Sequence, residues 1–520
     1  MARVHPLLDG VDTIGDHYRC NVDWDGLFES LYEKIRGNWL TQREPERWPT
    51  PDKNWVLRTA PKFTSDPFHR FEKQLQKQVA ISLQSEGWGN DVPTASGLVD
   101  RNARQMNVDL AHQWGDGFEL VEVKVDSDSP IEAALQILRY GAIYLLYRLE
   151  PDLVSRFKTH SMLRARWISL EVLAPRRYYK ASNMDLRHIE KRLNWQVQQF
   201  VSSRATDLAM SFRFTAFPDD FLYAPGIEDA RIRSAVHRRV APSSNPVSVI
   251  GCGGEPIHSF ADWERYALPA ERKRHWKTGR SACELGRAWT ANGEPRVPLE
   301  IALLLDSRCE TAGTVIQCGK TEHETQLPFS SRGPRCHDLA LQGMRDAQVI
   351  TVCIEAKADE SFGGTVSEEL ARARQRPASR FADRLEWLSL ALLGVPAFAD
   401  NKQCELSETI APLPYQLFAA IAGTLLEARQ QKAAVAVFIV HEFRTTATID
   451  SKMDENARAL NTFLGLLLSA NNGAGPDFAM GNGKLVGPIS MRKHSKHDVP
   501  DLPNHIPLFI GKIRTDLIVQ

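Results

Sequence analysis

Two stretches of this 520-residue chain carry the same order of charged and apolar residues. In the first, Asp-Leu-Ala at residues 109–111 precedes an apolar run that ends in Glu-x-Lys at residues 122–124. In the second, Asp-Leu-Ala at residues 338–340 precedes an apolar run that ends in Glu-x-Lys at residues 355–357. Short apolar runs predict buried strands, and residues two apart on a strand point to the same face. Each stretch therefore predicts two neighbouring strands that bring an Asp beside a Glu and a Lys.

This combination of residues is suited to a divalent metal ion and a phosphate. Two carboxylates supply hard oxygen ligands and leave room for water, which is the coordination that Mg²⁺ prefers. A bound ion neutralises charge on a phosphate and lowers the pKa of a water, and a lysine ammonium can orient that water. We therefore expect a phosphodiester-cutting site in each half, with Mg²⁺ or Mn²⁺ as the cofactor. Glu-x-Lys alone is a weak signal, because a third copy at residues 271–273 lies in a run of charges and is interpreted as a solvated helix face.

The elements expected around the two stretches follow a similar order of helix, strands, helix and strand. In the first half they are a helix at 68–83, strands at 106–112 and 118–125, a helix at 131–149 and a strand at 167–173. In the second half they are a helix at 281–291, strands at 301–305, 337–341 and 349–357, a helix at 415–431 and a strand at 433–443. A charged, helical insertion around residues 368–393 separates the second Glu-x-Lys from the helix that follows it.

These residues resemble the PD-(D/E)XK nuclease superfamily, which has the restriction-endonuclease-like fold. The resemblance covers most of residues 68–180 and, with insertions, residues 281–443. It implies the α/β fold class with two restriction-endonuclease-like domains, each a mixed sheet flanked by helices. It also implies a metal-binding set made of a helix acid, a strand acid and the glutamate of Glu-x-Lys. That set is Glu72, Asp109 and Glu122 in the first copy and Glu284, Asp338 and Glu355 in the second.

The resemblance assigns catalytic roles to four further residues. Lys124 and Lys357 would assist the attacking water. Gln136 and Tyr140 match a Gln-x-x-x-Tyr pattern of recombination-type members, where it helps to hold substrate and site together. In the second copy, Gln416 heads the corresponding helix.

Some features leave other interpretations open. Neither strand Asp follows the proline of the superfamily motif, and residues 355–363 also resemble a bacterial family with no assigned function. Glu122 and Lys124 could form a strand pair that only neutralises itself. Gln136 and Tyr140, four residues apart, could be an ordinary helix-face pair.

The composition predicts two domains joined by a linker. Residues 232–257 are rich in Arg, Ser, Pro and Gly, which predicts a linker between an N-terminal domain, residues 1–231, and a C-terminal domain, residues 258–520. A chain of this length exceeds what a single core usually organises. Basic residues near the linker could line a path for a phosphate backbone. They are Arg231, Arg233, Arg238, Arg239, Arg272, Lys273, Arg274, Lys277 and Arg280.

Net charge, cysteine spacing and hydropathy limit the partners, bound metals and cellular location that we expect. The formal net charge is zero, so any binding of nucleic acid must rest on local patches. The eight cysteines are scattered without a Cys-x-x-Cys pair, which favours reduced thiols over zinc sites or disulfides. No apolar run reaches the ~20 residues that span a bilayer, and the N-terminus lacks a signal-peptide core. We expect a soluble, cytoplasmic protein with no membrane partner.

The favoured hypothesis is a metal-dependent nuclease, a hydrolase that cuts phosphodiester bonds in nucleic acid, with DNA favoured, in bacterial DNA processing or anti-phage defence. Partner proteins or a homodimer are compatible with it. One alternative is a non-catalytic nucleic-acid-binding or scaffold protein that retains nuclease folds, and another is activity in the N-terminal domain alone. In an active site the Asp and Glu carboxylates should converge within about 5 Å with the lysine alongside. The sequence does not decide between DNA and RNA, strandedness or cleavage specificity.

Overall fold

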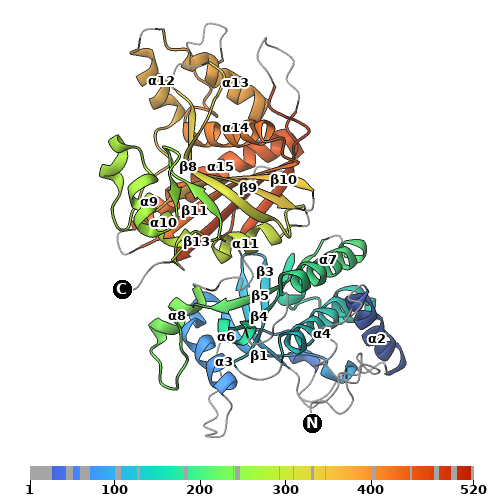
Figure 1. Ribbon diagram of the computed structural model, residues 1–520. Helices are drawn as coiled ribbons and strands as arrows, with labels where there is room; N and C mark the ends of the chain where they lie inside the picture. Colours follow the sequence, from blue (N-terminus) through green and yellow to red (C-terminus); the bar gives the residue numbers. More distant parts are fainter. Residues whose placement is uncertain are drawn as a thin grey trace. The chain divides into compact units, whose positions relative to one another are not determined.

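The computed structural model divides into two compact units, which are described separately (Figure 1). The first unit comprises Met1–Ser244 and Asp306–Gly313, and the second comprises Asn245–Leu305 and Thr314–Gln520. The structure describes residues 26–42, 51–58, 71–99, 107–125, 129–180, 186–205, 207–218, 220–237, 239, 246–291, 293–308, 310–329, 333–345, 347–376, 378–399, 405–445, 448–472, 479–492 and 501–516.

The first unit is built on a five-stranded mixed sheet. Its strands, in spatial order, are β1 (Trp88–Pro93), β2 (Asn107–Trp114), β3 (Gly117–Val123), β4 (Trp167–Pro175) and β5 (Ala209–Phe217). Strands β1 to β3 are antiparallel neighbours, whereas β3, β4 and β5 run parallel. Parallel neighbours need a crossover connection, and helices α4 (Pro130–Leu149) and α7 (Leu186–Arg204) lie in those two connections.

Helices cover both faces of this sheet. On one face, α4, α7 and α2 (Leu27–Gln42) share a hydrophobic core with β3, β4 and β5. On the other face, α3 (Phe71–Ser82) and α8 (Asp229–His237) pack in a separate apolar cluster. Helix α4 begins with a capping box, in which Ser129 and Glu132 each bind the other's backbone N–H, and Pro130 occupies its first turn. Strand β3 is buried throughout, as expected of a near-continuous apolar run between covered faces.

The second unit contains an eight-stranded mixed sheet. Its spatial order is β12 (Lys484–Ile489), β13 (Leu508–Asp516), β11 (Val435–Arg444), β10 (Gln348–Lys357), β9 (Arg335–Arg345), β8 (Val315–Thr325), β6 (Ser248–Ile250) and β7 (Pro256–Ile257). Strands β8 to β10 are antiparallel neighbours, and β10, β11 and β13 run parallel. The series β8, β9, β10, β11, β13 thus repeats the pairing pattern of the first unit's β1 to β5.

The helices between β10 and β11 form two layers. Helix α14 (Tyr415–Gln430) packs on the sheet, while α12 (Val366–Arg374) and α13 (Phe381–Leu393) belong to the predicted insertion. Figure 1 shows α14 between α13 and the sheet. The insertion therefore thickens the helical layer of this unit, to which α15 (Asp450–Asn472) also contributes.

The fold class predicted from the sequence is confirmed at the level of two mixed sheets flanked by helices. One expected strand is wrong, because residues 301–305 lie inside helix α11 (Leu299–Asp306). A short apolar run has no periodicity that separates a buried strand from a buried helix. Strands β1, β5 and β8 and helix α7 were not expected. The predicted linker, residues 232–257, contains the end of α8 and strands β6 and β7.

Within the described residues, no helix is both long enough and apolar enough to cross a membrane.

Candidate functional site

In the first unit, the strand Asp and Glu-x-Lys meet where the pairing of β2 with β3 stops. The last paired residues on this side are Leu110 and Val121, so Asp109 and Glu122 are the next residues on the two strands. The Oδ2 atom of Asp109 accepts a hydrogen bond of 3.0 Å from the backbone N–H of Val123. The aspartate is therefore fixed to the middle residue of Glu-x-Lys.

The second unit repeats this arrangement. Pairing of β9 with β10 stops at Leu339 and Ile354, which leaves Asp338 and Glu355 as the next residues. The Oδ2 atom of Asp338 accepts a hydrogen bond of 2.7 Å from the backbone N–H of Ala356, again the middle residue of Glu-x-Lys. The two sequence copies thus share a hydrogen-bonded backbone arrangement as well as residue types.

The glutamate of the first site is buried beside its lysine. The Nζ atom of Lys124 lies 3.0 Å from Oε1 of Glu122, and their side chains are 6% and 1% exposed. Lys124 also donates to Oε1 of Gln136 on α4, at 3.3 Å. The other carboxylate oxygen of Glu122, Oε2, is buried without a hydrogen-bond partner. Burial and then the charge of Asp109 raise the pKa of Glu122 well above its usual range.

An unsatisfied oxygen of this kind is costly in a protein interior. A cation next to Glu122 and Asp109 would relieve both the missing contact and the repulsion between the two carboxylates. The first site therefore fits a divalent ion in the chemistry of its donors. Among the residues that the structure describes, no group of three or more His, Cys, Asp or Glu is arranged to hold a metal ion, so this fit rests on two carboxylates.

The remaining predicted residues of the first site lie around this pair. Glu72 on α3 accepts a hydrogen bond of 3.0 Å from the N–H of Val125, one residue after Lys124. Tyr140 on α4 donates to the carbonyl of Asn107 at the start of β2, at 2.9 Å. Burial and then the charges of Glu122 and Asp109 raise the pKa of the Tyr140 phenol well above its usual value. The structure therefore brings all six predicted residues of the first copy around the end of β3.

Sequence reasoning missed two members of this site. Lys73, next to Glu72 on α3, places its Nζ 3.3 Å from Oδ1 of Asp109 and 3.2 Å from Oδ1 of Asp91. Asp91 is the β1 residue opposite Asp109, between the pairs 90–110 and 92–108, and its φ is +51°. A left-handed aspartate in a strand has no periodic signature in a sequence, although Asp and Asn adopt this conformation more readily than most residues.

The second unit has a matching acid on its equivalent strand. Glu322 on β8 lies opposite Asp338, between the pairs 321–339 and 323–337, and its φ is +47°. Its Oε2 atom lies 2.6 Å from Nη1 of Arg272. Both units thus oppose the strand aspartate with a left-handed acid that is paired to a basic side chain.

The charges around Glu355 differ from those around Glu122. Its Oε1 lies 2.7 Å from Nζ of Lys357 and accepts a hydrogen bond of 2.5 Å from Nε2 of Gln416. Its Oε2 is in an ion pair with Nη2 of Arg335, on β9. Burial tends to raise the pKa of Glu355, but Arg335 and Lys357 more than offset it, and the pKa is lowered. Both oxygens of this glutamate therefore already have cationic or amide partners.

The two other predicted acids of the second unit are Asp338, which resembles Asp109, and Glu284, which differs from Glu72. Burial and then the charge of Glu355 raise the pKa of Asp338 well above its usual range. Glu284, the predicted helix acid, accepts from the N–H of Gly279 at 2.7 Å and lies 3.3 Å from Nη1 of Arg287. These contacts lie at the start of its own helix, α10 (Ser281–Trp289), and link it to neither Asp338 nor Glu355.

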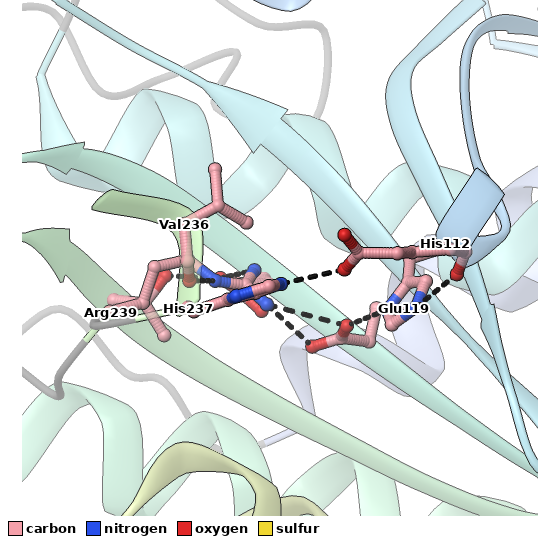
Figure 2. A network of polar contacts seen from close by, with 8 residues as sticks. His112, Glu119, Val236, His237 and Arg239 are labelled. Atoms are coloured by element: carbon pink, nitrogen blue, oxygen red, sulfur yellow. Dashed lines mark hydrogen bonds and ion pairs between the residues drawn. The ribbon is translucent and has the colours of Figure 1, made fainter. Parts of the chain in front are cut away.

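A second buried polar network lies in the first unit on the other face of β3, since Glu119 is three residues before Glu122. Figure 2 shows Arg239 between Glu119 and the backbone of Val236, with His112 on the far side of Glu119. Arg239 Nη1 also lies 2.7 Å from Oε1 of Glu171. Burial opposes ionisation of Glu119, but Arg239 and His112 lower its pKa to about 2. Arg239 thus anchors part of the predicted linker in the first unit.

Several residues of the predicted basic path are committed to acids of the chain. Arg233 pairs with Glu86 at 3.4 Å and Arg280 with Asp359 at 3.2 Å, in addition to the pairs of Arg239 and Arg272 described above. Arg238 lies outside the described residues. These pairs reduce the charge that the clusters could offer to a phosphate backbone.

Fold and site together define a two-unit α/β protein with a duplicated Asp and Glu-x-Lys site. The chain belongs to the family described as a domain of unknown function (DUF6946), which matches residues 256–517 and so covers most of the second unit. No curated protein and no solved structure matches the chain.

Proposed function

We propose that this chain is a metal-dependent nuclease and that its first unit hydrolyses phosphodiester bonds in nucleic acid, with DNA as the favoured substrate. One observation carries the proposal. Glu122 keeps a buried, unpartnered carboxylate oxygen next to Asp109, with the ammonium group of Lys124 alongside. Most buried carboxylate oxygens have a hydrogen-bond partner, so an open one next to a second carboxylate is a candidate position for a cation.

We further propose that each unit has the restriction-endonuclease-like core. The support is the repeated order of two antiparallel pairings followed by two parallel ones. In both units the strand aspartate binds the middle N–H of Glu-x-Lys, and a helix follows that strand before the parallel neighbour.

Asp109 and Glu122 would hold a divalent ion, Mg²⁺ or Mn²⁺, with Glu72 at the edge of the site. When bound, such an ion supplies Lewis-acid stabilisation of a phosphate and acidifies a water. The chain's own residues orient the reaction. Lys124 can donate from Nζ to a water or to a phosphate oxygen that gains charge, and Gln136 restrains that Nζ by accepting from it.

A second candidate role applies to the second unit. We propose that it does not cut, because Glu355 has partners on both oxygens and Glu284 binds within its own helix start. This corresponds to a nuclease in which the first unit alone is active and the second contributes contacts. A scaffold without any activity is the remaining alternative, and it would require that the wild-type protein cuts no nucleic acid with either metal.

The test is cleavage of a panel of single- and double-stranded DNA and RNA with Mg²⁺, Mn²⁺ or a chelator. Lys124→Ala should lower the cleavage rate by about 10²–10³-fold, the usual cost of removing a group that stabilises developing charge. Lys357→Ala is the matched control in the second unit and should keep most of the activity. No cutting by the wild-type protein with either metal, or cutting by Lys124→Ala at the wild-type rate, would reject the proposal.

A further inference from the structure

We propose that Arg335 takes the place of a divalent cation in the second unit, so that this Asp and Glu-x-Lys site is neutralised from within and does not bind metal. This inference concerns the second site and deepens the proposed function only by saying which of the two sites takes an ion. The two sites share the same backbone contacts. In each, the strand aspartate accepts from the middle N–H of Glu-x-Lys, and the lysine lies within 3.0 Å of the glutamate.

The difference lies at one carboxylate oxygen. Oε2 of Glu122 is buried without a hydrogen-bond partner, whereas Oε2 of Glu355 is paired with the guanidinium group of Arg335. Oε1 of Glu355 is also used, by Lys357 and Gln416. A metal ion at Glu355 would therefore have to displace a charged partner that Glu122 lacks, since the second cation of the first site, Lys73, pairs with Asp109 instead.

Arg335 also interacts electrostatically with Asp338, the other acid that would bind an ion. Burial disfavours its charge, but Glu355 and then Asp338 more than compensate and raise the pKa of the guanidinium group. The positive charge of Arg335 thus acts first on Glu355, with which it is in direct contact, and then on Asp338. A divalent ion placed nearby would be repelled by that charge in a medium that screens poorly.

The fold provides space for the arginine. Its side chain is 10% exposed, so it is not a surface residue that happens to reach the site. Gly423 on α14 lies against it, and a Cβ atom at that position would come within 2.9 Å of Cγ of Arg335. The helix that covers the site therefore lacks a side chain where the stem of Arg335 passes.

The test uses Mn²⁺-dependent thermal melting of the full chain, with the first site disabled by Asp109→Asn. This parent should show no rise in melting temperature with Mn²⁺. Adding Arg335→Met should lower the melting temperature in chelator and make it respond to Mn²⁺, by roughly 5 °C or more at about 100 times the dissociation constant. Arg335→Lys, which keeps the positive charge, is the matched control and should not respond.

Each outcome of the melting experiment either supports or overturns the proposed role of Arg335. A rise with Mn²⁺ in the parent that Glu355→Gln removes would overturn the proposal, because the second site would then bind metal with Arg335 in place. A folded Arg335→Met variant without a response would overturn it as well. If this variant unfolds in chelator, it must regain structure on refolding with Mn²⁺, and failure to do so counts against the proposal. The readout needs no cleavage, so failure of the proposed nuclease activity would be seen separately.

Discussion

Glu122 and Glu355 hold matching positions in the two units, but their carboxylates meet different neighbours. Each follows a strand residue paired with the Leu of Asp-Leu-Ala, and each lies beside the lysine two residues on. Glu122 has a buried oxygen with no partner, whereas Glu355 is bound by Lys357, Gln416 and Arg335. The same backbone arrangement thus surrounds two glutamates with different charged neighbours, and we propose that this difference decides which of them needs a cation.

The largest expected effect is on the cleavage rate, in which we expect substitutions of the two glutamates to differ. Glu122→Gln should lower the cleavage rate by at least about 10²-fold, because the amide cannot supply the charge that holds an ion and stabilises the reaction. Glu355→Gln should leave the rate within about 2-fold in the proposed arrangement, and a cleavage assay on the best substrate of the panel measures both. Equal losses in the two variants would mean that both sites cut.

The next largest effect is on the free energy of unfolding, and it distinguishes Arg335 from Lys73, the basic partners of the acids in the two sites. Arg335→Ala removes a buried partner of Glu355 and should lower the free energy of unfolding by about 3–5 kcal/mol. Lys73→Ala in the first unit should cost no more than about 1 kcal/mol, because the Lys73 side chain is 41% exposed and its ion pairs are partly solvated. Urea denaturation of both variants measures these changes, and a Lys73 effect as large as that of Arg335 would contradict the difference in burial.

Much of the Asp and Glu-x-Lys arrangement could be predicted from the sequence, because the residues that form it lie close together along the chain. Asp109, Glu122 and Lys124 occupy one short segment with a strand pattern, and both Glu-x-Lys copies end buried strands as expected. Arg335 was not predicted because its partner, Glu355, lies on the neighbouring strand. Nothing in the local sequence distinguishes this arginine from one on the surface. Asp91 was missed because its strand is short and its backbone is left-handed.

Arg239 shows another limit of sequence reasoning. It lies in a stretch rich in Pro, Gly and Ser that predicts a linker, yet its side chain is buried with Glu119 and Glu171. A burial of this kind depends on strands far apart in the sequence, so composition cannot indicate it. The structure assigns this arginine to the interior of the first unit.

The smallest expected effect is a pH dependence within the first unit, away from the candidate site. The pKa of Glu119 falls to about 2 from its usual 4.5, so its ion pairs stabilise the fold fully above pH 4.5. That contribution is lost as the pH falls from 4.5 through 2. The free energy of unfolding of Glu119→Gln should therefore change less steeply over this window than that of the wild-type protein. An unchanged slope would mean that Glu119 is not held ionised by Arg239 and His112.

Of the two equivalent glutamates, we propose that Glu122 needs an ion and that Glu355 has a cation of the chain, Arg335, in its place. Calorimetric titration of the full chain with Mn²⁺ tests this proposal most directly, with Asp109→Asn and Asp338→Asn as matched variants that keep an acceptor for the backbone N–H. We expect one Mn²⁺ per chain in the wild-type protein, none in Asp109→Asn and one in Asp338→Asn. Two ions per wild-type chain, or binding that survives Asp109→Asn and is lost in Asp338→Asn, would contradict the account.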